Sequence, residues 1–221
     1  MAREPTIETR ILRTLDRHFA PGLPFGRFAG NVLVLSLAGL IPAVAVFVAL
    51  SPGLGAHLAA GTGAGGRFLR QVLTNGLPVV FAVNFAGFLL YARLRADRAA
   101  PGRMLALDLL ARVGLFVGLH AVIFATSALA FGSFGGDPVQ ALRVVGPTLV
   151  QAAAFGNLSG AYLYATILSA LPLHMAVLAR LLGRPAGSGA GVLLGLLAFA
   201  VQAAVLTAVA ALITLLQPAA G

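Results

Sequence analysis

Charged residues inside apolar stretches are the first candidates for chemistry, because a charge within a membrane is costly and by default marks a functional site. Asp108 and Arg112 are four residues apart in such a stretch, so their side chains can pair along one face of a helix. Two interpretations of this pair stay open. It is either a structural ion pair at the headgroup boundary of a membrane, or a gating or ion-binding pair.

His120 and His174 have the residue type of metal ligands. His120 lies eight residues after Arg112, and His174 lies six residues before Arg180. At 1.5 Å per helical residue, these separations correspond to depths of about 12 Å and about 9 Å. If both arginines mark the same membrane face, the two imidazoles lie at similar depth and could ligate a haem iron. The alternative, which we favour, is that each is a buried histidine bonded to a neighbouring helix, and that the protein holds no cofactor.

Several polar residues fall near the middle of apolar stretches and could share one site. If their side chains converge, they line a small polar cavity of the kind found in transporters and channels. If each points at a neighbouring helix, they hold the helices together. The cavity hypothesis requires Asn84, His120 and Gln202 to face one another. The mid-membrane set is Asn84, His120, Thr166, Ser169 and Gln202, and the candidate ligand or cavity-lining residues are Asn84, Asp108, Arg112, His120 and Gln202.

Motifs for covalent or metal chemistry are missing. The chain has no cysteine, which excludes disulfides, thiolate metal sites and thiol nucleophiles. The segment from Asn157 to Ala161 superficially resembles the Gly-x-Ser-Gly motif of rhomboid proteases, but Asn157 replaces the first glycine. The last apolar stretch, where that family has its catalytic histidine, contains no histidine. A serine without a base is not a nucleophile, so we expect no catalytic role for Ser159 and no catalytic or metal site elsewhere.

The composition places these candidates in a membrane. Of the 221 residues, 59% are apolar and 10% are charged, and the mean hydropathy is +0.97. A soluble domain has about 45–50% apolar and about 25% charged residues. All fifteen basic residues are arginine, which together with abundant Ala, Gly, Leu and Pro is typical of a GC-rich bacterial genome. We therefore expect a multi-pass protein of the bacterial inner membrane that does not bind nucleic acid.

Five stretches are apolar and long enough to cross a bilayer as helices, which takes about 20 residues. They predict an all-α fold, a polytopic transmembrane helix bundle. We expect two segments not to span: an amphipathic cytoplasmic segment at 1–29, and a helix near 138–155 that begins with Asp137 as N-cap and Pro138 at its first position. A sixth span through 138–155 is the alternative. The spans lie near 30–50, 76–92, 104–131, 160–179 and 191–216, within a membrane domain of residues 30–221.

The connections between the predicted spans differ in charge. With five spans, eleven arginines lie on the side of the N-terminus and three lie on the opposite side. The positive-inside rule therefore places the N-terminus in the cytoplasm and the C-terminus outside. A sixth span would move Arg180 and Arg184 to the outside, so five spans are preferred.

Pairs of small residues four apart allow helices to approach closely. Gly114 with Gly118, and Gly39 with Ala43, are such pairs, and they form either a seam between subunits or contacts inside the bundle. Because no reactive constellation is present, we expect an integral membrane subunit, or an assembly or stabilising factor, of a larger bacterial membrane complex, without chemistry of its own. Its expected partners are the lipid bilayer and other membrane subunits or a second copy. The alternatives are a small-molecule or ion permease component and, after it, a membrane haem protein or membrane enzyme.

Overall fold

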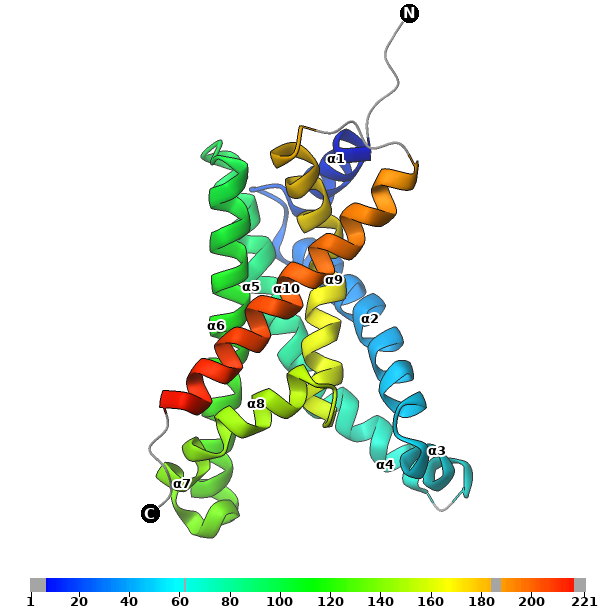
Figure 1. Cartoon of the computed structure of the whole chain (residues 1–221), viewed down its shortest axis with the longest axis vertical. Coiled ribbons are helices and arrows are strands. Elements are labelled where there is room, and N and C mark those ends of the chain that lie inside the picture. The colour runs from blue at the N-terminus through cyan, green and yellow to red at the C-terminus, as the bar shows by residue number, and fades with distance from the viewer. Residues whose placement is uncertain (1–6, 62, 184–187, 217–221) are drawn as a thin grey trace, which may run out of the picture.

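A computed structural model describes residues 7–61, 63–183 and 188–216, and every regular element in this part of the chain is a helix. Five of these helices are long and apolar enough to cross a membrane, which confirms the predicted all-α bundle of a multi-pass membrane protein. They run in alternating directions along the long axis of the molecule (Figure 1). The five are α2 (Phe25–Ala49), α5 (Leu77–Ala96), α6 (Pro101–Phe131), α9 (Leu158–Leu181) and α10 (Ser188–Leu216).

Helix α9 is the centre of the bundle. It packs against the four other spans and also against α1 (Ile7–Phe19) and α8 (Val145–Ala153). Most of the apolar length of α9 is buried in protein, whereas α6 and α10 leave most of theirs exposed. In Figure 1, α10 crosses obliquely in front of α9. Side chains on α9 are therefore surrounded by other helices, and the outer faces of α6 and α10 are open to lipid.

Small residues face each other where α2 packs against α9. A methyl group at Gly39 would overlap the backbone oxygen of Ala165 and the hydroxyl of Ser169. That hydroxyl lies 2.7 Å from the Ala165 carbonyl oxygen and 3.0 Å from the carbonyl oxygen of Leu35 on α2. The Ser169 hydroxyl thus adds a polar contact between the two helix backbones to the apolar packing of α2 against α9.

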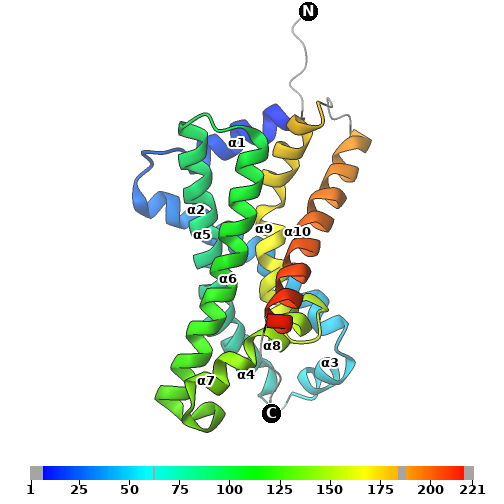
Figure 2. The same cartoon turned by 60° about the vertical axis from the view of Figure 1, so that its left-hand side comes forward.

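The amphipathic helix α1 lies across the end of the bundle where α5 joins α6 (Figure 2). Its apolar face is buried, with Leu15 and Phe19 packed against the spans. Asp16 fixes the helix to α5: its carboxylate accepts hydrogen bonds from the Tyr91 hydroxyl at 2.8 Å and from Arg95 Nε and Nη2 at 3.1 and 3.0 Å. The position of α1 is therefore set by both apolar and ionic contacts.

The opposite end of the bundle carries short helices. These are α3 (Pro52–Ala59), α4 (Ala64–Gln71), the 3-10 turn η2 (Ser133–Gly136), α7 (Pro138–Arg143) and α8. A π-helical turn η1 (Val72–Gly76) connects α4 to α5, so that Ala64–Ala96 forms one long helix. As the sequence predicts, Asp137 caps α7 by accepting a bond from Val139 N–H at 2.8 Å. The segment 138–155 is broken at Val144 into α7 and α8, neither of which is long enough to cross a membrane.

Candidate functional site

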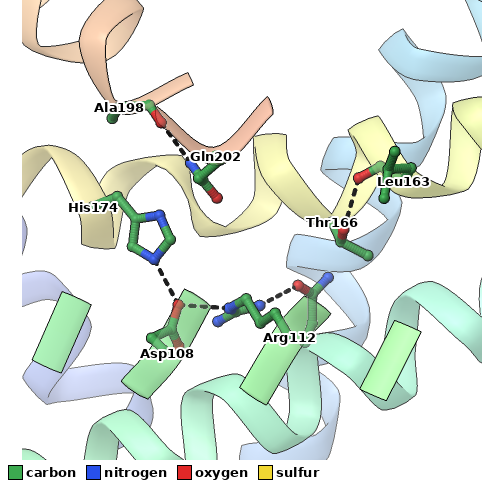
Figure 3. A network of polar contacts seen from close by, with 8 residues as sticks. Asp108, Arg112, Leu163, Thr166, His174, Ala198 and Gln202 are labelled. Carbon is green, nitrogen blue, oxygen red and sulfur yellow. Dashed lines mark hydrogen bonds and ion pairs between the residues drawn. The ribbon is translucent and has the colours of Figure 1, made fainter. Parts of the chain in front are cut away.

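A buried charged cluster joins α6 to α9 (Figure 3). Asp108 Oδ2 accepts hydrogen bonds from Arg112 Nε at 2.8 Å and from His174 Nε2 at 2.6 Å. Asp108, Arg112 and His174 are 2%, 6% and 1% exposed. Asp108 and Arg112 meet because they are one helical turn apart on α6, and His174 meets them because α9 is central. Charge-assisted bonds of this length are among the stronger polar contacts in proteins.

The cluster extends from Arg112 to two further helices. Arg112 Nη1 donates to Asn84 Oδ1 on α5 at 2.6 Å, and Asn84 Nδ2 donates to Ser36 Oγ on α2 at 3.0 Å. Both Asn84 and Ser36 are fully buried. The contacts therefore run without interruption through α2, α5, α6 and α9, and we name these five residues the core polar network: Ser36, Asn84, Asp108, Arg112 and His174.

Two residues of α5 accommodate the Arg112 side chain, one by its small size and one by the face of its ring. A methyl group on Gly87 would overlap the guanidinium group, so only glycine leaves space for it there. Arg112 Cζ also lies 4.9 Å from the centroid of the Phe88 ring, where the ring face attracts a cation. The neighbouring helix is thus shaped to hold a buried arginine.

The cluster lies inside the bundle and not at its edge. Helix α6 begins at Pro101, so Arg112 is eleven residues, or about 16 Å, from the start of its helix. Its guanidinium is enclosed by α5 and α9. The pair is therefore buried inside the helix bundle, and its two interpretations from the sequence, a structural ion pair at the headgroup boundary or a gating or ion-binding pair, stay predictions.

Three polar atoms of the network lack a partner among the described residues: Asp108 Oδ1, Arg112 Nη2 and His174 Nδ1. Buried polar atoms are satisfied in most proteins, and exceptions accompany a bound water or a functional group. A cavity of about 10 Å³ beside Arg112 is also lined by Thr166 and Gln202. That volume is at the lower limit for a single water molecule, so this cavity holds at most about one water beside Arg112.

The structure brings together only part of the predicted polar set. Asn84, Asp108 and Arg112 are in contact, whereas Gln202 Nε2 donates to the Ala198 carbonyl of its own helix at 3.2 Å. Thr166 likewise donates within α9 at 2.6 Å, and His120 belongs to a different cluster. Asn84, His120 and Gln202 therefore do not face one another across a shared cavity.

The two histidines are too far apart to ligate one haem iron. His174 is bonded to Asp108, and His120 is twelve residues after Asp108 on the same helix, which corresponds to about 18 Å. The equal depths expected from the sequence assumed that Arg112 marks the membrane boundary. Since Arg112 lies well inside the helix, His120 lies deeper than that count implied.

His120 makes a second polar cluster, with Ser159 of α9. His120 Nδ1 is 2.9 Å from the Phe116 carbonyl oxygen, and His120 Nε2 is 3.1 Å from Ser159 Oγ. No local sequence pattern indicates this pair, because 38 residues and several helices separate the two positions in the chain. The expectation that no histidine lies beside Ser159 is wrong, since the His120 imidazole comes from the third span and not the last.

No family model matches the chain, and no curated protein or solved structure matches it either. The fold therefore defines the class, a multi-pass helical membrane protein, and the function has to be argued from its own residues.

Proposed function

We propose that the protein is a subunit of a larger membrane complex and binds a transmembrane helix of a partner subunit through α6. The observation that carries this proposal is the position of Gly114 and Gly118. Both lie on the exposed face of α6, four residues apart, and no atom lies within 4 Å of the place where a side chain would begin on either.

This surface has the shape of a helix-docking site. Leu110 and Val122 lie one turn before and one turn after the two glycines, and they are 65% and 59% exposed. The glycines therefore form a notch between two larger side chains on one ridge of α6. In lipid, helices associate where small residues allow their backbones to approach, because burial of apolar side chains gives little gain there.

Three other glycines are already used inside the bundle. Gly39 contacts α9, Gly76 leaves room for the Tyr162 ring, and Gly87 leaves room for Arg112. Each would clash if it carried a side chain. At Gly114 and Gly118, by contrast, no atom of the described residues would clash with a side chain. This supports a role for the two glycines in contact with another protein.

We further propose that the protein lies in a bacterial inner membrane with α1 in the cytoplasm. Helices α5 and α9 carry Arg93, Arg95 and Arg180 in their last turns, and these helix ends lie at the end of the bundle where α1 lies (Figure 1). Arg67, Arg70 and Arg143 lie on helices of the opposite end. This distribution supports a cytoplasmic position for the first end.

The test is extraction of the protein from its native membrane in a mild detergent, with mass spectrometry of the proteins that remain bound. We expect stoichiometric partners for the natural chain and their loss from the double variant G114L/G118L. The matched control is A200L/A204L, which adds the same bulk to two exposed small residues four apart on α10. Retention of the partners by G114L/G118L, or extraction of the natural chain alone, would contradict the proposal. Retention of only a second copy would identify self-association through the same face.

A further inference from the structure

Ser159 and His120 have the relative position of a nucleophile and its base. Ser159 is the second residue of α9, and its Oγ lies 3.1 Å from His120 Nε2 on α6. A hydroxyl within hydrogen-bond distance of an imidazole, with that imidazole held by a third group, is the arrangement that activates a serine. Here the third group is the Phe116 carbonyl, 2.9 Å from His120 Nδ1.

The hydrogen bonds assign the tautomer of His120. A carbonyl oxygen only accepts, so Nδ1 must carry the proton that it donates to Phe116. In the neutral imidazole, Nε2 then has a free lone pair and accepts the Ser159 hydroxyl proton. This is the tautomer that a general base requires, and it is set by a bond to the backbone of the same helix.

The start of α9 supplies donors beside the serine. Asn157 caps the helix, because its Oδ1 accepts from Gly160 N–H at 3.2 Å, and its Nδ2 donates to the Thr148 carbonyl at 3.0 Å. Within the described residues, the N–H groups of Leu158 and Ser159 have no acceptor. The first N–H groups of a helix bind negative charge, so these two are available to an oxyanion that forms on an acyl group at Ser159 Oγ.

The surroundings of the pair favour a lipid-soluble substrate. His120 is 5% exposed and lies between the rings of Phe116 and Phe124, at centroid distances of 4.4 and 6.2 Å. Ser159 is half-buried. Both residues lie on spans, and among the described residues neither forms a hydrogen bond or ion pair with a charged side chain. An acyl chain from the bilayer matches this environment, and a charged peptide does not.

We propose that Ser159 is a nucleophile, activated by His120, that takes an acyl group from a lipid ester. Ser159 Oγ forms a bond to the ester carbonyl carbon while its proton passes to His120 Nε2. The tetrahedral intermediate collapses by breaking the bond to the alcohol oxygen, which leaves with the proton from His120. Water, deprotonated by His120, then releases the fatty acid and restores the serine. This activity is independent of the α6 notch, because His120 is two residues from Gly118 and points to the other side of the helix.

The first experiment is labelling of the full chain in a mild detergent with an alkyl fluorophosphonate, located by mass spectrometry. We expect the label on Ser159 and none in S159A. H120Q should slow labelling at least about 100-fold, since a general base contributes about 10²–10⁴ in rate. The control S127A removes a serine two turns from His120 on the same helix and should label as the natural chain does. No label on Ser159 in monodisperse protein, or equal rates in H120Q, would overturn the proposal.

A second experiment uses the absence of cysteine from the chain. In S159C the only thiol lies beside His120, which favours the reactive thiolate. We expect iodoacetamide to alkylate S159C about 10-fold faster than S159C/H120Q, because a neighbouring base lowers the pKa of a thiol. Equal rates would show that His120 does not act as a base at this position.

The substrate class is tested with two esters of p-nitrophenol. Natural protein in phosphatidylcholine vesicles should release p-nitrophenol faster from the decanoate than from the acetate, and S159A should release neither above the blank. Faster release from the acetate would overturn the assignment to lipid esters, even if Ser159 is labelled.

Discussion

His174 Nε2 lies 2.6 Å from Asp108 Oδ2, and this contact ties the central helix α9 to α6. The same carboxylate oxygen also accepts from Arg112. Asp108 therefore holds two helices together and balances the charge of a buried arginine. Burial of an ion pair adds little stability by itself, but removing one partner leaves an uncompensated charge in the protein interior.

Replacement of Asp108 by asparagine should destabilise the protein strongly. In D108N the Arg112 charge stays buried without its counter-ion, and the expected loss in free energy of unfolding is about 3–5 kcal/mol. The measurement is unfolding of the purified protein in mixed micelles by increasing mole fraction of dodecyl sulfate.

The control for this variant is D97N. Asp97 also pairs with an arginine four residues away, Arg93, at 3.2 Å, but both side chains are more than half exposed. Surface pairs contribute at most about 1 kcal/mol, so D97N should unfold nearly as the natural chain does. Similar effects of D108N and D97N would mean that the core polar network does not stabilise the fold.

Gly87 and Gly114 provide a matched pair of glycine substitutions. G87A should destabilise by about 1–3 kcal/mol, because the new methyl group overlaps the Arg112 guanidinium. G114A adds the same methyl group where nothing lies within 4 Å, and alanine is favoured over glycine in a helix by about 0.5–1 kcal/mol. The same unfolding assay compares the two. If G87A were as stable as G114A, the guanidinium would have to occupy another position.

The topology can be tested with reporter fusions. Alkaline phosphatase, which is active only outside the cytoplasm, should be inactive when fused after Arg98 and active when fused after Gly221. The reason is that five helices of the described residues can cross a membrane, which puts the two fusion points on opposite sides. An inactive fusion after Gly221 would indicate an even number of spans. Replacing Arg93, Arg95 and Arg98 by alanine should weaken the preference for this orientation.

The spans were predictable because each is a long apolar run, and hydropathy depends only on local sequence. The boundaries of the helices were less predictable than the spans themselves. Helix α2 begins at Phe25 and α6 at Pro101, before the predicted positions 30 and 104, since helices extend beyond the apolar core to the residues that follow Pro24 and Ala100. For the site this means that Arg112 is eleven residues from the start of its helix, and not eight as the predicted start at Met104 implied.

Contacts between helices were not predictable from one sequence. Asp108 with Arg112 could be paired because four residues form one turn. No local pattern connects His174 to Asp108 or Ser159 to His120, since these contacts depend on which helices are neighbours and how they are rotated. Ser36 was not singled out for the same reason: a lone serine in an apolar helix gives no sign that it accepts a bond from Asn84.

Asp16 offers a way to release α1 without altering the spans. In D16N the neutral amide keeps the size of the side chain but loses the ionic part of its bonds to Arg95 and Tyr91. Because the Asp16 side chain is 38% exposed, the expected loss is at most about 1 kcal/mol. Trypsin should then cleave within α1 up to about 5-fold faster. The control T14A removes a hydroxyl that bonds only within α1 and should leave the rate unchanged. An unchanged rate in D16N would mean that the apolar contacts of Leu15 and Phe19 suffice to hold α1.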